Sequence, residues 1–407
     1  MIINSIKNHK INKILQNDIH NFEQTINLIG SANIPFKESI QALSYPIFSN
    51  PLEGFRNNRI YPNSEVLDEI EKLGEECLSK LFSYSQEKYS VSFQPHSGTT
   101  ANQIIYNAIL EKNDIVLSMS INSGGHISHH DYIKKFFKLK TFNLNNNDEL
   151  DYNIIKEIIE KNQVKLLIVG ASSFPNEIKY SILHKICQEF NVLLLADISH
   201  TALFISEGIH ETPFNYADFI TFTTHKTTRG TRGGIIIYKN CFSTIIEKSI
   251  FPITQSAPKF YDILSKVIML IKLNEFDRKK YILDALNFSQ YFIKYFQQKK
   301  IKIFTNKSDT HLAILDLTDQ KINAIEAELL LSKINILTNR CFVPSDINVQ
   351  NGLRFGFLSL AVVQMNLKDF HDICDVIFEQ LFLREKYKLK YKVSNIAEKY
   401  FKGLYND

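Results

Sequence analysis

One lysine in this sequence has the surroundings of a reactive amine. Lys226 follows an apolar run at residues 219–222 and is itself followed by polar residues and glycines. An amine attacks an aldehyde only in its neutral form, so such a site must lower the lysine pKa through partial burial and nearby cations. His225, Arg229 and Arg232 could supply that charge. Taken alone, a lysine in a basic turn is more often simply solvated.

A carboxylate follows another apolar run upstream of this lysine. Asp197 comes directly after residues 193–196, at the place where open α/β sheets hold their ligands. A carboxylate there could keep the nitrogen of a pyridine-type ring protonated, which makes the ring an electron sink for a carbanion. The alternative is an ordinary helix N-cap, because aspartate is also common at that position.

Two further segments carry groups that could hold a phosphorylated aromatic ligand. Residues 97–99, Ser-Gly-Thr, precede a helix-like segment, so their N–H groups and hydroxyls could hold a phosphate at the positive end of the helix. Such residues also form ordinary capping turns. Residues 124–126, Gly-Gly-His, permit close backbone approach, and the imidazole could stack on a flat ring. A lone histidine, however, is more often structural.

These residues need a scaffold that brings them together. From about residue 90 to 240, short apolar runs alternate with helix-like segments, which is typical of a parallel sheet with crossover helices. The predicted strands are residues 115–119, 166–170, 192–196, 219–222 and 234–238, and the predicted helices are residues 103–110, 154–159 and 178–190. The pattern predicts an α/β domain whose strands are covered on both faces.

The C-terminal part predicts a second, smaller α+β unit. Helical spacing continues from Pro258 to about Gln298 and could bridge to this unit, which would contain strands near 311–317 and 334–338 and helices near 324–332 and 367–382. We therefore expect an N-terminal arm at residues 1–50, a large domain at 51–275 and a small domain at 276–407. Residues 383–398 alternate lysine with apolar residues, which favours a solvated face over a nucleic-acid patch.

Composition excludes several functional classes. The chain has 407 residues, 44% of them hydrophobic, which is enough for a large core. A formal net charge of +4 implies neither a nucleic-acid nor a membrane partner. No run approaches the ~20 apolar residues of a membrane helix, and residues 1–10 lack a hydrophobic stretch, so we expect a soluble, unprocessed protein. The five cysteines lie far apart without a CxxC pair, which favours a reducing cytoplasm and no metal site.

In their order and spacing, these motifs resemble those of serine hydroxymethyltransferase. That enzyme has fold type I, depends on pyridoxal 5′-phosphate (PLP) and exchanges a one-carbon unit between serine and glycine with tetrahydrofolate. The resemblance spans nearly the whole chain and implies a large domain with a mixed, mostly parallel sheet flanked by helices. The matching motifs are Ile26-Asn-Leu-Ile-Gly-Ser31-Ala-Asn33, Glu53-Gly-Phe55, Gln94-Pro-His-Ser-Gly98, Gly124-Gly-His126, Ala196-Asp-Ile-Ser-His200, Thr223-Thr-His-Lys-Thr-Thr-Arg-Gly230, Thr310-His-Leu312 and Gly352-Leu-Arg354-Phe-Gly356.

The resemblance implies a role for each matching residue. Lys226 would be the Schiff-base lysine, Asp197 the partner of the pyridinium nitrogen, and His126 the stacking ring. Arg354 would hold the substrate carboxylate through both of its oxygens. The remaining implied positions are His200 at the phenolic side of the cofactor, Ser31 at the substrate carboxylate, Ser172, Thr223 and His225 at the cofactor, Ser97, Gly98 and Thr99 at its phosphate, Gly233 and Gly234 in a loop that reaches the neighbouring subunit's phosphate, and Glu53 and Tyr61 near the bond that breaks.

The sequence departs from the family pattern mainly on the folate side. Ile60 replaces the first tyrosine of a pair, and Cys341 replaces the asparagine that meets the pterin. Loss of polar contacts should weaken discrimination for the pterin. The other departures are Pro62-Asn63 for a glycine pair, Pro51 for a tyrosine near the phosphate, and Phe357-Leu358 after Gly356.

The leading interpretation is aldol-type cleavage or formation of a Cα–Cβ bond on glycine, serine, threonine or a related β-hydroxy amino acid. Folate use stays open, because the same electron sink could run threonine aldolase or transaldolase chemistry without it. Transamination or decarboxylation is a further alternative, and a non-catalytic binding protein is a remote one. The resemblance implies a homodimer with shared active sites, or a tetramer.

Overall fold

A seven-stranded sheet is the centre of the larger unit in the computed structural model, which describes residues 10–45, 51–346, 349–383 and 388–404. The strand order is β4-β10-β9-β8-β7-β5-β6, and only β10 among these strands runs against the others. The strands are β4 (Tyr89–Ser92), β5 (Ile115–Met119), β6 (Lys138–Phe142), β7 (Val164–Val169), β8 (Leu193–Asp197), β9 (Phe219–Thr223) and β10 (Gly234–Lys239). The predicted α/β class with a mixed, mostly parallel sheet is confirmed.

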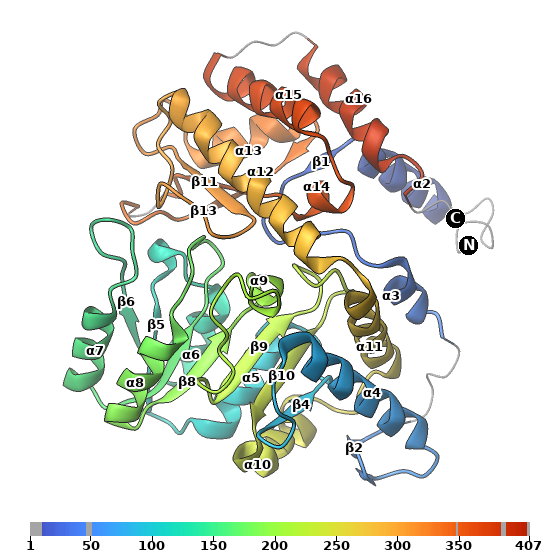
Figure 1. Ribbon diagram of the computed structural model, residues 1–407, viewed down its shortest axis with the longest axis vertical. Coiled ribbons are helices and arrows are strands. Elements are labelled where there is room, and N and C mark those ends of the chain that lie inside the picture. Colours follow the sequence, from blue (N-terminus) through green and yellow to red (C-terminus); the bar gives the residue numbers. More distant parts are fainter. Residues whose placement is uncertain (1–9, 46–50, 347–348, 384–387, 405–407) are drawn as a thin grey trace.

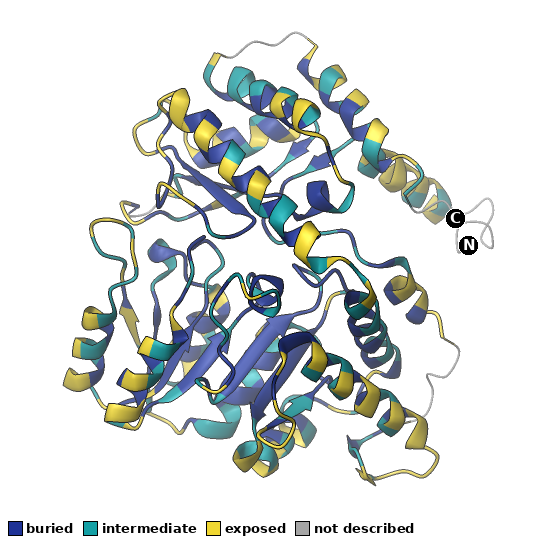
Figure 2. Ribbon diagram, viewed as in Figure 1, coloured by how far each residue is buried: buried dark blue, intermediate teal, exposed yellow. Residues whose placement is uncertain are grey.

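Helices cover both faces of this sheet. On β8, Leu194 and Ala196 belong to one hydrophobic cluster while Leu195 between them belongs to the other, so the strand is buried on both sides. Figure 2 shows buried strands between helices whose outer surfaces are exposed. The helices are α4 (Glu65–Phe82), α5 (Gly98–Ile109), α6 (Asp131–Phe136), α7 (Tyr152–Lys161), α8 (Tyr180–Phe190), α9 (Ala202–Ser206), α10 (Ser243–Lys248) and α11 (Phe260–Glu275).

The smaller unit is built on a three-stranded antiparallel sheet in the order β11-β14-β13. Its elements are β11 (Leu312–Asp316), β13 (Asn339–Cys341), β14 (Gly352–Gly356), α12 (Arg278–Gln298), α13 (Ala324–Ser332), α14 (Leu358–Val362), α15 (Leu367–Phe378) and α16 (Leu389–Phe401). The long helix α12 packs against β11, α14 and α15, which places it over this unit (Figure 1).

The N-terminal segment joins the smaller unit although the two are far apart in sequence. Strand β1 (Ile26–Asn27) pairs in parallel with β12 (Ile336–Leu337), and α2 (Lys10–Glu23) lies beside α16 (Figure 1). Helix α3 (Lys37–Ala42) instead packs against α11 of the larger unit. The N-terminal segment therefore connects the two units.

Several differences from the sequence-based predictions have local causes. The segment with helical spacing from Pro258 to about Gln298 contains two helices, α11 and α12. They are separate because Phe276 is extended and the Asp277 side chain caps α12 by accepting from Lys280 N at 3.0 Å. In the run 383–398, which was predicted to present a solvated face, residues 384–387 lie outside the described part. Helix α16 exposes Lys390 and Tyr391 on one side and buries Val393 on the other.

Some sequence-based predictions stay open in the structure. Residues 1–9, most of the N-terminal stretch predicted to be unprocessed, also lie outside the described part, and the domain boundaries remain predictions. Of the helices that are described, none combines the length and apolar character needed to cross a bilayer.

Candidate functional site

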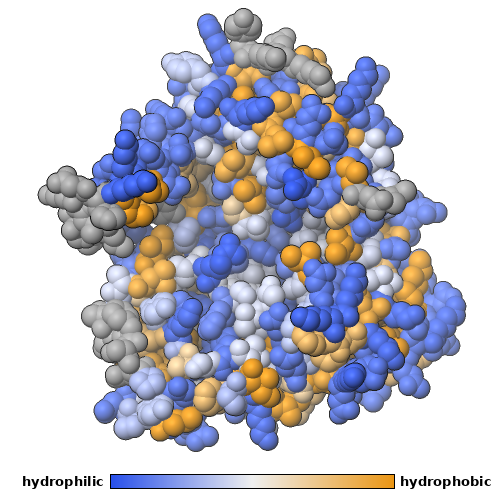
Figure 3. All heavy atoms as spheres, turned by 180° about the vertical axis from the view of Figure 1, so that it is seen from behind, coloured by the Kyte–Doolittle hydropathy of each residue, from blue (hydrophilic) through white to orange (hydrophobic). Residues whose placement is uncertain are grey.

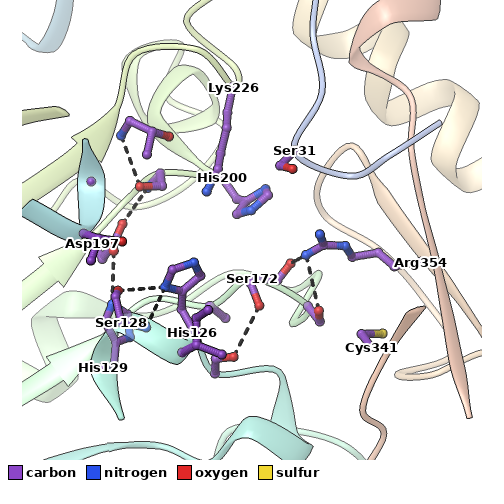
Figure 4. Close-up of a pocket in the computed structure, with 18 of the residues that line it drawn as sticks. Ser31, His126, Ser128, His129, Ser172, Asp197, His200, Lys226, Cys341 and Arg354 are labelled. Carbon is purple, nitrogen blue, oxygen red and sulfur yellow. Dashed lines mark hydrogen bonds and ion pairs between the residues drawn. The ribbon is translucent and has the colours of Figure 1, made fainter. Parts of the chain in front are cut away.

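A cavity of about 450 Å³ opens at the edge of the large sheet where its parallel strands end. His126 follows β5, Ser172 follows β7, Asp197 ends β8 and Lys226 follows β9, and all four line the cavity. Arg354 on β14 reaches it from the smaller unit, so Figure 4 shows these side chains around one space. The structure thus brings together the residues that the sequence analysis placed after separate strands.

Lys226 lies buried in the turn after β9. Its side chain and backbone together are 6% exposed, and its carbonyl accepts from Asn33 Nδ2 at 2.6 Å. Burial lowers the pKa of its amine to about 8, helped by the charges of Arg354 and Arg232 and opposed by Asp197. Among the described residues, no carboxylate forms an ion pair with this amine. A neutral, nucleophilic amine is therefore accessible near physiological pH.

Asp197 is held ionised by its neighbours. One carboxylate oxygen accepts from His129 Nε2 at 3.0 Å and Asn102 Nδ2 at 2.9 Å, and the other accepts from Ser199 N at 3.1 Å. Burial would raise the pKa of Asp197, but the hydrogen bond and charge of His129, together with the charge of Lys226, keep it well below its usual range. The N-cap alternative does not apply, because Thr201 is the N-cap residue of α9.

The two residues that orient this carboxylate were not predicted from the sequence. Asn102 is one turn into α5, and its own orientation is set by Thr221, whose hydroxyl donates to Asn102 Oδ1 at 2.7 Å. His129 lies just beyond the glycine-rich run that drew attention to His126. Only proximity in the folded chain identifies these two residues as the anchors of Asp197.

His126 and His200 face the cavity as neutral rings. His126 Nδ1 accepts from the backbone N–H of Ser128 at 3.1 Å, and burial lowers the pKa of His126 to about 3 with help from His129 and Lys226. Burial likewise lowers the pKa of His200 well below its usual value, and its ring stacks on His311 at a centroid distance of 5.5 Å. Neutral imidazoles at both places suit stacking and hydrogen bonding rather than charge pairing.

Arg354 presents a buried guanidinium without an anionic partner. It donates to Asn339 Oδ1 at 3.3 and 3.2 Å, to Ser173 Oγ at 3.4 Å and to the carbonyl of Ser172. In the part of the chain that is described, no carboxylate lies within ion-pair distance of it. A buried cation held by neutral groups is suited to an anionic ligand. Ser31 lines the same cavity.

The predicted phosphate-binding segment forms the start of α5. Ser97 is the N-cap, and its hydroxyl accepts from Thr100 N at 3.1 Å, so this hydroxyl serves the helix itself. Gly98 and the exposed Thr99 follow, and both line the cavity. A Cβ on Gly98 would meet the Thr223 methyl at 2.6 Å. The helix N-terminus thus offers the cavity free N–H groups on closely packed backbone.

Gly234 supports this segment within the same chain. A Cβ at Gly234 would lie 2.3 Å from the carbonyl oxygen of Ser97, and Gly234 N donates to the carbonyl of Pro95 at 3.1 Å. The predicted approach of Gly233 and Gly234 to a neighbouring subunit's phosphate remains a prediction.

Three residues that line the cavity have a buried polar atom without a hydrogen-bond partner among the described residues. These atoms are Nδ1 of His129, Oγ1 of Thr223 and Nδ1 of His225. An unpaired buried polar atom costs free energy. A polar ligand such as a phosphorylated pyridine would satisfy these atoms.

Glu53 and Tyr61 are not among the residues that line the cavity of their own chain. They flank the hairpin of β2 (Gly54–Phe55) and β3 (Asn58–Arg59), which lies at the edge of the molecule beside α4 (Figure 1). Tyr61 is 44% exposed, whereas Glu53 Oε2 is buried without a hydrogen-bond partner in the described chain. Their expected place near the bond that breaks therefore remains a prediction.

Cys341 lies in the wall of the cavity beside Arg354. Cys341 is 7% exposed, and burial raises the pKa of its thiol to about 11. The thiol therefore stays protonated and forms weak hydrogen bonds at best. Phe342 lines the cavity next to it, together with the polar side chains of Asn339, Arg340 and Gln350.

Comparison with known proteins adds to this geometry. The family model described as serine hydroxymethyltransferase matches residues 5–377. A serine hydroxymethyltransferase of Buchnera aphidicola subsp. Cinara cedri (strain Cc) is 31% identical over 424 aligned positions that cover 100% of both chains. Serine hydroxymethyltransferase 1 of Pseudomonas fluorescens (strain Pf0-1) is 31% identical over 378 positions, 91% of each chain.

Proposed function

Because the chain belongs to the serine hydroxymethyltransferase family of PLP-dependent transferases, we propose that it makes or breaks the Cα–Cβ bond of a β-hydroxy amino acid such as serine or threonine. One observation carries the proposal. The cavity holds a buried amine, an ionised carboxylate and a guanidinium without an anionic partner, on Lys226, Asp197 and Arg354. These groups suit an aldehyde, a ring nitrogen and an amino-acid carboxylate.

The residues that line the cavity offer suitable groups for each part of PLP. Lys226 would hold the aldehyde, Asp197 the ring nitrogen, and the N-terminus of α5 the phosphate, while the unpaired atoms of Thr223 and His225 would gain partners. When bound, PLP supplies a carbonyl that bonds to amines and a protonated ring that withdraws electrons from the α-carbon of the amino acid.

The chain's own groups position the substrate and move protons. Arg354, oriented by Asn339, would bind the α-carboxylate through two hydrogen bonds and so fix which bond of the α-carbon is held for reaction. The Lys226 amine, with its pKa near 8, can accept and return a proton beside the cavity. Asp197 remains ionised. Because His126 is neutral, it adds no positive charge that would compete with the ring nitrogen for the Asp197 carboxylate.

We further propose a homodimer in which Glu53 and Tyr61 enter the cavity of the second copy. Glu53 Oε2 has no partner among the described residues, which supports this arrangement. Exposed apolar side chains also support it; they are Ile40, Leu43 and Tyr45 in and just after α3, Ile60 just after β3, and Val66 and Leu73 on α4. Figure 3 shows separate groups of hydrophobic residues among hydrophilic ones on the back of the molecule, a mixture common at protein interfaces.

The buried thiol of Cys341 favours a reaction without tetrahydrofolate. The resemblance places a pterin contact at this position, and a buried thiol cannot replace an asparagine amide as a donor and acceptor. Folate-dependent hydroxymethyl transfer is the second candidate, which the names of the relatives favour. We also propose a cytoplasmic location, which the five free cysteines support.

Product analysis with and without tetrahydrofolate tests these proposals. The purified holoenzyme is incubated with serine, threonine and alanine, and glycine and aldehyde are measured. We expect glycine and an aldehyde from threonine without folate. If glycine forms only when folate is present, hydroxymethyl transfer is the function. A keto acid or carbon dioxide in place of glycine would contradict aldol chemistry and support transamination or decarboxylation.

A further inference from the structure

A second buried lysine lies behind the phosphate-binding segment, outside the residues assigned so far. Lys266 is on α11 and is 2% exposed. Its Nζ donates to the carbonyl oxygens of Phe93 at 2.6 Å and Pro95 at 2.8 Å. None of the described carboxylates forms an ion pair with it. A buried ammonium held only by neutral carbonyls is costly for the free protein, because desolvation outweighs those hydrogen bonds.

The carbonyls that Lys266 holds belong to the backbone that leads into α5. Pro95 comes two residues before Ser97, and the Pro95 carbonyl also accepts from Gly234 N at 3.1 Å. A Cβ on Gly233 would meet Cε of Lys266 at 2.5 Å. The lysine, the glycine pair and residues 93–95 are therefore packed as one unit directly behind the start of α5.

The charge of Lys266 is poorly compensated by its surroundings. Burial lowers the pKa of this amine to about 8, against the opposing charges of Asp262 on the same helix and Glu71 on α4. Glu71 is itself paired with Arg59, and Lys259, just before α11, adds a like charge. A dianionic group at the adjacent helix N-terminus would stabilise the charged form of the lysine.

We propose that Lys266 is a positioning residue for the phosphate of the bound ligand. It holds the backbone of residues 93–95 so that the N–H groups of α5 point into the cavity, and its charge favours a phosphate there over an empty site. The inference rests on the proposed function only in that the cavity binds a phosphorylated pyridine. Lys266 does not line the cavity and touches no reacting atom.

Binding of two probes to the apoprotein tests this role. The first probe is 4-deoxypyridoxine 5′-phosphate, which lacks an aldehyde and therefore cannot bond to Lys226; the second is 4-deoxypyridoxine without phosphate. Calorimetry compares wild type with Lys266→Gln, which keeps a donor but loses the charge. We expect the Kd of the phosphorylated probe to rise about tenfold, as for one lost charge interaction across a partly buried site, and the Kd of the other to stay within about twofold.

Two further variants and a pH series complete the test. Lys266→Met, which also loses the hydrogen-bond donor, should weaken binding of the phosphorylated probe more than Lys266→Gln does. Lys272→Gln is the control, since Lys272 is on the same helix but pairs with Glu38 and Glu275 at the surface. Wild-type affinity for the phosphorylated probe should fall as pH rises through about 8, as the lysine loses its charge, and this fall should shrink in Lys266→Gln.

The outcomes separate this inference from the proposed function. If the Lys266 variants lose affinity equally for both probes, or keep their affinity for both, the role of Lys266 is merely structural. Either result would overturn this inference and leave the proposed function standing. If wild type binds neither probe, the proposed function fails instead. Unfolding temperatures of the apoproteins show whether Lys266→Gln folds; if it does not, Lys266→Met carries the same comparison.

Discussion

At the scale of single residues, the negative group in the cavity has close partners, whereas the positive groups lack anionic ones. Asp197 has His129 and Asn102 as partners, whereas Lys226 and Arg354 have no carboxylate partner among the described residues. The protein is therefore electrostatically prepared for a ligand that brings negative charge. In the proposed function, a phosphate and an amino-acid carboxylate would provide that charge.

The Arg354→Lys variant tests the carboxylate contact. A lysine lacks the planar fork that Asn339 orients, so it cannot bind both carboxylate oxygens. We expect the KM for the amino acid to rise roughly 10- to 100-fold, or about 1.4 to 2.7 kcal/mol, with a smaller change in kcat. Arg278→Lys is the control, because Arg278 pairs with Glu207 outside the cavity. An unchanged KM in Arg354→Lys would rule out this contact.

The pH dependence of PLP uptake tests the state of the Lys226 amine. Its pKa is lowered to about 8, so the neutral fraction should rise about tenfold per pH unit below that value and level off above it. Stopped-flow absorbance should show the rate of PLP binding to apoprotein following this curve. A rate that keeps rising toward the ordinary lysine value of 10.5 would mean that burial does not lower the pKa.

The site residues that follow strands were predictable from the sequence. The residues that orient them were not. Lys226 and Asp197 stood out because polar residues interrupt long apolar runs at strand ends. Asn102 and His129 carry no such local signal, since their roles depend on which side chains α5 and the segment after β5 bring near Asp197. In the proposed dimer Glu53 would show the same limit, because its place in a site would depend on how two chains assemble.

At the scale of elements, buried strands were predictable and edge strands were not. Strand β5 occupies the predicted residues 115–119, because a strand covered on both faces is continuously apolar. Strand β6 at the sheet edge has the sequence Lys-Leu-Lys-Thr-Phe and is largely exposed, so it lacks the apolar run that reveals a strand. The short pairing of β1 with β12 joins distant segments and has no signal in either.

The Gly234→Ala variant tests how closely β10 must pack against the start of α5. The added Cβ would lie 2.3 Å from the Ser97 carbonyl oxygen, so the phosphate-binding backbone must shift. We expect PLP affinity to fall at least tenfold, or about 1.4 kcal/mol, as measured by equilibrium titration of the apoprotein. In the control Gly208→Ala, the Cβ meets open space, so affinity should not change. The variant should still cost about 1 kcal/mol of folding stability, because alanine is strained at the φ of +69° that Gly208 adopts. Equal affinities would contradict this packing argument.

At the scale of the whole molecule, the cavity lies between two units and lacks Glu53 and Tyr61 of its own chain. Arg354 comes from the smaller unit and Lys226 from the larger one, so their relative placement controls whether both can hold one ligand. The proposed dimer adds a third source of residues. A complete site then requires two units of one chain and the hairpin of another.

Mixed dimers test whether Glu53 acts in the second copy. Lys226→Ala and Glu53→Gln are each expected to be inactive, but a mixed dimer would have one site with Lys226 from one chain and Glu53 from the other. Random mixing makes half of the dimers mixed, so roughly a quarter of wild-type activity should return. Activity near zero after exchange of subunits, confirmed by native mass spectrometry, would place Glu53 in the cavity of its own chain or outside the reaction.

Borohydride reduction followed by peptide mass spectrometry tests the central claim most directly. Reduction fixes PLP permanently to the lysine that holds it. We expect the added mass on the peptide that contains Lys226, and none on that peptide in Lys226→Ala. Modification of a different lysine, such as Lys266, or no modified peptide in protein saturated with PLP, would contradict the assignment of Lys226.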